Sequence, residues 1–208
     1  MLQVENLSVS IAGKSLLNNV SLSVATGARA VLRGANGAGK TTLVNAILGD
    51  PDYEVSGRII FDGADITKLK TDARARAGLF VGQQVVPEIP GLSVMTFLKH
   101  SYMSHFGDRP MGEFMTALKA AAAALDIPDA WLGRSVNVGF SGGEKKRLSF
   151  LRLLLIRPKM AVLDEMDSGA DLNARTLFGK IIDDMKETTF LVITHQDVFF
   201  KATDEISF

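Results

Sequence analysis

The chain has 208 residues, 47% of them hydrophobic, which is enough for one sizeable domain with a filled core or for two small ones. Lysine and arginine together number 23, as do aspartate and glutamate, and no apolar run approaches the roughly 18 residues of a membrane span, so we expect neither a nucleic-acid-binding surface nor direct membrane insertion. The sequence contains no cysteine, which excludes disulfides and thiolate ligands for zinc or an iron–sulfur cluster within this chain and fits a cytoplasmic protein.

Apolar residues alternate with polar ones in the first part of the chain, which predicts β-strands with turns at Gly13 and Gly27. Residues 28–33 form a short apolar run that is typical of a buried strand. This run ends at a glycine-rich loop, residues 34–39, after which we expect a helix from Lys40 to Leu48. Further strands are predicted at 58–61 and 78–81.

The pattern becomes helical between Ser93 and Leu125, where Pro110 and Gly112 divide the stretch into two helices. Residues 134–139 have the composition of a loop. The remaining predicted elements are a helix capped by Ser141 that reaches about Ile156, a helix at 172–185, and strands at 160–163, 190–194 and 206–208. Strands that alternate with helices indicate an α/β fold with a mostly parallel core sheet covered on both faces.

The segment from Gly34 to Thr41 reads Gly-Ala-Asn-Gly-Ala-Gly-Lys-Thr and fits the phosphate-loop pattern G-x-x-x-x-G-K-[ST] at every fixed position. Glycines let backbone N–H groups turn inward around phosphate oxygens, and the following helix points its positive end at them. An ordinary glycine-rich turn is the alternative, but a strand before the motif and a helix after it disfavour that reading. The residues predicted to contact ATP here are Gly34, Asn36, Gly37, Ala38, Gly39, Lys40, Thr41 and Thr42.

Within this loop, Lys40 supplies a charge to the β- and γ-phosphates, the Thr41 hydroxyl is a ligand for Mg²⁺, and Thr42 reaches the α-phosphate. The apolar strand at 160–163 ends at two acids, Asp164 and Glu165. Asp164 is predicted to hold the magnesium shell, and Glu165 to orient or polarise the attacking water. The alternative is that the two acids are only a solvated pair at a strand end. The complete phosphate loop upstream disfavours this alternative.

Residues 140–144, Phe-Ser-Gly-Gly-Glu, resemble the signature motif of the ATP-binding-cassette family. Ser141, Gly142 and Gly143 open a predicted helix whose N-terminus is a second anion site. An ordinary helix cap is the alternative. The resemblance implies that these three residues meet the γ-phosphate held by the opposite subunit of a pair of cassettes.

Three further positions resemble functional motifs of the same family. Gln84 resembles the Q-loop glutamine, which senses magnesium and the γ-phosphate, although the adjacent Gln83 leaves a one-residue ambiguity. Residues 168–171 resemble the D-loop. His195 resembles the switch histidine, and its place at the end of a predicted strand, where ligands bind in open α/β sheets, favours function over a structural role.

A closer resemblance is to the SufC family, the ATPases of the Suf iron–sulfur cluster assembly system. The stretch Pro-Glu-Ile-Pro-Gly-Leu-Ser at 87–93 and the stretch Asn-Val-Gly-Phe-Ser-Gly-Gly-Glu-Lys-Lys-Arg within 134–147 are rarely shared by generic cassettes. The resemblance covers essentially the whole chain. The other stretches that carry it are 52–57, 163–169 and 193–195.

The sequence departs from the SufC pattern at several positions. Met166 stands where the family more often has threonine or serine, and Ala170 where leucine is usual, both at the expected meeting point of two cassettes. No aromatic residue stands near 11–14 to stack on adenine, so apolar contacts are expected to hold the base. Members of the family continue past the strand near Ile206 into another strand and a helical tail, whereas this sequence ends at Phe208.

The resemblance implies a single cassette domain over residues 1–208. Residues 1–83 and 158–208 would form the core with an antiparallel β subdomain, and 84–157 a helical subdomain. The implied function is Mg²⁺-dependent ATP hydrolysis that drives cluster assembly on SufB- and SufD-like scaffold partners, through a transient ATP-dependent homodimer. Two alternatives remain open: the nucleotide-binding subunit of a membrane transporter, and a truncated cassette that binds ATP without efficient turnover.

Overall fold

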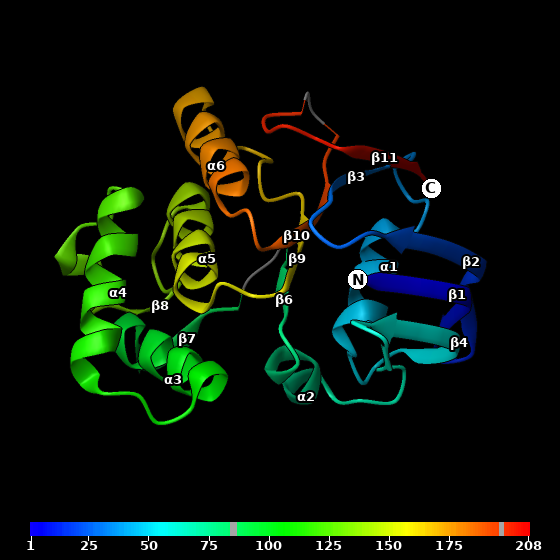
Figure 1. The fold of residues 1–208 in the computed structure, drawn as a ribbon, viewed down its shortest axis with the longest axis horizontal. Coiled ribbons are helices and arrows are strands. Elements are labelled where there is room, and N and C mark those ends of the chain that lie inside the picture. Colours follow the sequence, from blue (N-terminus) through cyan, green and yellow to red (C-terminus); the bar gives the residue numbers. More distant parts are fainter. Residues whose placement is uncertain (84–86, 196–197) are drawn as a thin grey trace.

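The computed structural model describes residues 1–83, 87–195 and 198–208 (Figure 1). At the centre of this part of the chain lies a five-stranded sheet in the order β11-β3-β10-β9-β6, in which every neighbouring pair is parallel. Its strands are β3 (Arg29–Arg33), β6 (Leu79–Gly82), β9 (Met160–Asp164), β10 (Thr189–Ile193) and β11 (Asp204–Ser207). The predicted α/β class with a parallel core sheet is therefore confirmed.

Both faces of the core sheet are buried, as the apolar strand runs predict. On β10, Phe190 and Val192 pack into the cluster formed with the large helices, whereas Leu191 and Ile193 pack into the cluster formed with α1 (Lys40–Leu48). This alternation arises because successive side chains of a strand point to opposite faces of its sheet. Consecutive residues of β10 thus contribute to the hydrophobic clusters on opposite faces of the sheet.

An antiparallel sheet lies on the α1 side, in the order β2-β1-β4-β5 (Figure 1). The predicted strand at 58–61 is longer than expected. It begins at Glu54 because its first half pairs with the far end of β1, where Ser10 faces Glu54 and Val9 faces Val55. The strands are β1 (Leu2–Ile11), β2 (Lys14–Val24), β4 (Glu54–Phe61) and β5 (Ala64–Asp65).

Helices cover the opposite face of the core sheet, where Figure 1 shows α5 beside α6 and α4 on the outer side of α5. The predicted break between two helices is confirmed, because α3 ends at Phe106 and α4 begins at Met111. The described helices are α2 (Thr71–Arg76), α3 (Val94–Phe106), α4 (Met111–Ala124), α5 (Gly142–Ile156), α6 (Leu172–Asp184) and the short 3-10 helix η1 (Asp129–Trp131). No helix in the described ranges is both long and apolar enough to cross a membrane.

Three short strands occur that the sequence did not predict: β5, and a pair formed by β7 and β8. β7 (Ile89–Ser93) pairs antiparallel with β8 (Ser135–Val136), so the expectation of a loop throughout 134–139 is wrong for residues 135 and 136. The proline and glycine inside β7 conceal it, and the pairing is irregular, with a register shift between Ile89 and Ser93. This small sheet attaches the segment before α3 to the segment before α5.

Candidate functional site

The glycine-rich loop connects the end of β3 to the start of α1. Gly37 and Gly39 have φ values of +80° and +99°, a left-handed conformation in which a side chain would be strained. A Cβ atom on Gly39 would also collide with the side chain of Leu17. Gly39 caps α1 without a side-chain hydrogen bond, so the first N–H groups of this helix are available to an anion.

The side chain of Lys40 crosses the loop. Its residue is only 5% exposed, and Nζ donates hydrogen bonds to the carbonyls of Gly34 at 2.9 Å and Ala35 at 2.8 Å. These carbonyls use two of the three donors of the ammonium group. The loop backbone therefore surrounds a buried positive charge at the start of a helix. This arrangement favours the binding of a phosphate group.

Asp164 ends β9 beside Thr41 and is 2% exposed. Burial raises the pKa of its carboxyl group and the charge of Glu165 adds to the rise, while a hydrogen bond with the Thr41 side chain opposes it. Among the described residues, Oδ1 of Asp164 is buried without a hydrogen-bond partner. An unpartnered carboxylate oxygen beside a hydroxyl is a pair of hard oxygen ligands, which fits Mg²⁺.

The raised pKa of Asp164 gives a stability prediction. Because the folded chain binds this proton more tightly than the unfolded chain, ionisation of Asp164 lowers the free energy of unfolding as the pH rises above the unfolded pKa. We expect Asp164→Asn at neutral pH to be more stable than wild type by about 1 kcal/mol. The gain should shrink as the pH falls toward that of the unfolded carboxyl. Thermal unfolding across a pH series measures this, and a lower melting temperature at neutral pH would contradict it.

Glu165 follows Asp164 directly and has a φ of +48°, which is uncommon for a residue other than glycine. The backbone holds this conformation in part through the N–H of Glu165, which donates to the carbonyl of Ile193 at 2.9 Å. Oε1 of Glu165 lies 3.2 Å from Nε2 of His195, and the two side chains are 21% and 39% exposed. The ends of β9 and β10 thus bring a carboxylate and an imidazole together at the carboxyl edge of the core sheet.

A cavity of about 450 Å³ joins these groups. It is polar and open, and it combines the phosphate loop with the two residues at the strand ends. Two residues predicted for the loop, Gly34 and Ala38, do not line it. The lining residues are Asn36, Gly37, Gly39, Lys40, Thr41, Thr42, Glu165 and His195.

The predicted signature residues do not line this cavity. Ser141 caps α5, its Oγ accepting from the N–H of Glu144 at 3.3 Å while the carboxylate of Glu144 accepts from the N–H of Ser141 at 2.7 Å. Ser141 and Gly142 are exposed, and a Cβ on Gly142 or Gly143 would meet no atom within 4 Å. Gln84 lies outside the described residues.

Three hydrogen bonds around the acidic strand end were not predicted. The Thr194 hydroxyl donates to Asp167 at 2.7 Å, and this buried bond joins the turn after Glu165 to the residue before His195. Lys146 on α5 donates to the backbone carbonyl of Ser168 and, at 3.4 Å, to that of Glu165. No local signal distinguishes Lys146 from the adjacent lysine, since only the fold shows which one faces the turn.

Comparison with known proteins identifies the family. Residues 17–168 match the family described as ABC transporter, which is more than half of the chain. The chain belongs to the ABC transporter family. As a member of this family it is an ATP-binding cassette, an ATPase that uses ATP with Mg²⁺.

Relatives of this cassette occur in several bacteria. It is 42% identical over 201 residues to a probable ABC transporter ATP-binding protein of Streptococcus pyogenes serotype M18, covering 94% of this chain and 78% of that protein. It is 40% identical over 200 residues to vegetative protein 296 of Bacillus subtilis, covering 93% and 77%.

Solved structures share the fold of this cassette. An ATP-binding subunit of an ABC transporter aligns with a TM-score of 0.81 at 22% identity, over 94% of this chain and 79% of that one. A dimeric, post-hydrolysis cassette bound to ADP and Pi aligns with a TM-score of 0.79 at 20% identity, over 94% and 88%.

Proposed function

We propose that this cassette is the ATPase of a Suf-type iron–sulfur cluster assembly system and acts on SufB- and SufD-like scaffold partners. The observation that carries the proposal is the pairing of β7 with β8, because it places the two most SufC-like stretches, 87–93 and 134–147, side by side next to the signature helix. The chain contains no cysteine, so a cluster would be assembled on cysteines of the partners. We also propose that residues 84–157 form the helical subdomain and that 1–83 and 158–208 form the core.

We assign the predicted roles to the residues around the cavity. Lys40 and the loop N–H groups bind the phosphates of ATP, and Thr41 with Asp164 holds Mg²⁺, which when bound neutralises charge on the phosphates. Glu165 positions water and accepts its proton, and His195 orients the Glu165 carboxylate. The assignment of Gln84 as a sensor of magnesium and the γ-phosphate stays a prediction.

Hydrolysis requires a second cassette under this proposal. The exposed N-terminus of α5, with Ser141, Gly142 and Gly143, lies outside the cavity of its own chain. A second copy would present this helix end to the γ-phosphate, where its N–H groups stabilise the developing charge. The transient ATP-dependent homodimer completes two such sites.

Scaffold partners would dock beside the helical subdomain. A groove of about 400 Å³ lies between α2 and α3. Its lining includes the apolar residues Leu79, Phe80 and Phe97 and also charged side chains such as Arg76 and Arg152. Such a groove fits the apolar face of a partner helix.

A phosphate-release assay tests the proposal against its alternatives. We expect ATP hydrolysis to rise several-fold when SufB- and SufD-like proteins of the same organism are added, and the three proteins to elute together without detergent. Co-purification with a membrane permease, and no response to the scaffold proteins, would favour the transporter subunit, which the names of several relatives also favour. Binding of ATP with no phosphate release under either condition would favour the cassette without turnover.

A further inference from the structure

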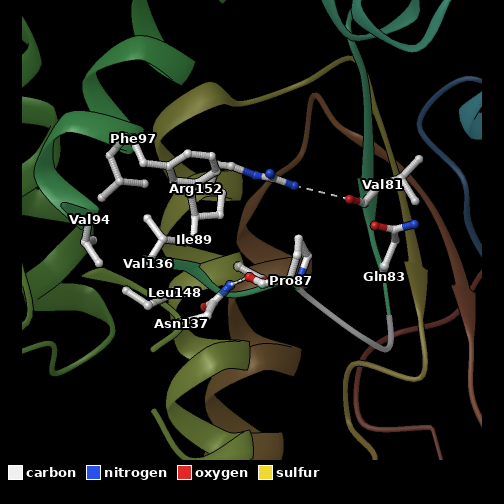
Figure 2. A pocket seen from close by; sticks show the side chains of 12 residues that line it. Val81, Gln83, Pro87, Ile89, Val94, Phe97, Val136, Asn137, Leu148 and Arg152 are labelled. Carbon is white, nitrogen blue, oxygen red and sulfur yellow. Dashed lines mark hydrogen bonds between the residues drawn. The ribbon is translucent and has the colours of Figure 1, made fainter. Parts of the chain in front are cut away.

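Asn137 joins the loop before the signature helix to a distant segment (Figure 2). Its Nδ2 donates a hydrogen bond to the carbonyl of Pro87 at 2.7 Å, and the residue is 7% exposed. Its φ is +61°, a conformation that asparagine adopts more readily than most residues. Because Pro87 precedes β7 and Asn137 follows β8, this bond extends the pairing of the two strands toward Ser141.

A second polar contact holds the same two segments together. Nζ of Lys145, in the first turn of α5, lies 2.8 Å from Oε1 of Glu88, and the two side chains are 24% and 50% exposed. The N–H of Gly91 also donates to Oγ of Ser135 at 3.1 Å. The start of α5 is therefore attached to the segment 87–93 on both sides of Ser141.

The few residues between Asn137 and Ser141 are held by contacts with Arg134 and Trp131. The guanidinium of Arg134 lies 3.7 Å from the centre of the Phe140 ring and donates to the carbonyl of Gly139 at 2.8 Å. The ring of Trp131 meets Phe140 edge-on, with ring centres 5.2 Å apart. Because these contacts brace the segment, we expect a displacement of Asn137 to move Ser141 as well.

Pro87 and Asn137 also border a cavity of about 190 Å³ between the helices and β6. Figure 2 shows Arg152 of α5 reaching across it to the carbonyl of Val81, a hydrogen bond of 3.2 Å. One wall of this cavity belongs to the core sheet and another to the segment that Asn137 holds. A change in the segment 87–93 would therefore move the signature loop relative to the core.

We infer that Asn137 is a positioning residue for ATP hydrolysis. Its side-chain amide couples the position of Ser141 to the position of the segment 87–93. The inference rests on the proposed role of Ser141 across paired cassettes. Ser141 must reach hydrogen-bonding distance of the γ-phosphate on the other chain, and small errors of placement have large effects on rate.

Asn137→Gly removes the side-chain hydrogen bond but keeps the backbone conformation, because glycine readily adopts a positive φ. We expect it to bind ATP with wild-type affinity, to lower kcat about tenfold, and to weaken ATP-dependent pairing in the Glu165→Gln background. Asn137→Asp, which keeps the size but presents only acceptors to the Pro87 carbonyl, should behave alike. Asn19→Gly is the matched control, since Asn19 is exposed with a φ of +52°.

Trp131 is the only tryptophan of the chain, so its fluorescence reports on the packing against Phe140. We expect the emission change on adding Mg-ATP to be smaller in both Asn137 variants than in wild type. Lys145→Ala removes the half-buried ion pair with Glu88 and should lower kcat in the same direction by less. Wild-type kcat and pairing in Asn137→Gly would overturn the inference. If Ser141→Ala also left kcat unchanged, the proposed role of the signature helix would fall with it.

Discussion

Glu165→Gln is expected to lower kcat by a factor of about 10² to 10⁴, the usual contribution of a general base, while ATP still binds. Glutamine keeps the shape of the side chain but cannot accept the proton of the attacking water. The cavity places Glu165 across from the phosphate loop, and His195 lies 3.2 Å from its carboxylate. Because the variant should bind ATP without consuming it, we expect the proposed ATP-bound pair of cassettes to accumulate.

Phosphate release measures the first effect, and light scattering with Mg-ATP measures the second. Glu187→Gln is a matched control, because Glu187 is exposed and does not line the cavity. His195→Ala should also lower kcat, by less, since the carboxylate remains. A wild-type rate in Glu165→Gln would mean that another group activates the water.

The sequence predicts the core of this molecule well because the relevant signals are local. The run from Met160 to Leu163 is apolar without alternation, which is typical of a short strand buried on both faces, and all its residues are buried in the parallel sheet. The helix cap at Ser141 is likewise a local signal, and the structure adds a capping box in which Glu144 bonds back to Ser141.

Contacts between distant segments could not be predicted in the same way. Arg74 and Arg76 stand two residues apart on α2 with similar neighbours, yet Arg74 is 3% exposed and Arg76 forms an exposed ion pair with Asp72. The difference arises because Arg74 faces the end of α1, where it donates to the carbonyls of Ala46 and Ile47. Only the packing of α2 against α1 determines which arginine is buried.

The candidate site shows the same division. The phosphate loop is contiguous, so its pattern identifies it. The proximity of Glu165 and His195 instead depends on β9 and β10 being neighbours in register, with Asp164 opposite Ile193. The link from Asn137 to Pro87 spans 50 positions and has no periodic signal. Such contacts follow from topology, which a motif alone does not specify.

Lys40→Ala is expected to weaken ATP binding at least tenfold. A charge-assisted hydrogen bond to phosphate contributes roughly 1.5–3 kcal/mol, and about 1.4 kcal/mol corresponds to a factor of ten in affinity. The position of Lys40 adds a second reason: its Nζ bonds to the carbonyls of Gly34 and Ala35, so the alanine variant also releases the two sides of the loop. The N–H groups that cradle the phosphates would then be less well ordered before ATP arrives.

Equilibrium binding of a fluorescent ATP analogue measures this loss, with thermal unfolding as a check that the variant remains folded. Lys159→Ala is the matched control, because Lys159 forms an exposed ion pair with Asp62 far from the loop and should leave ATP affinity unchanged. Lys40→Arg distinguishes the effect of the positive charge from the effect of the hydrogen bonds that hold the loop. It keeps the charge, but the larger planar guanidinium does not match a loop shaped around an ammonium group, so affinity should fall here too. Near-wild-type affinity in Lys40→Ala would place the phosphates elsewhere and remove the assignment of this loop.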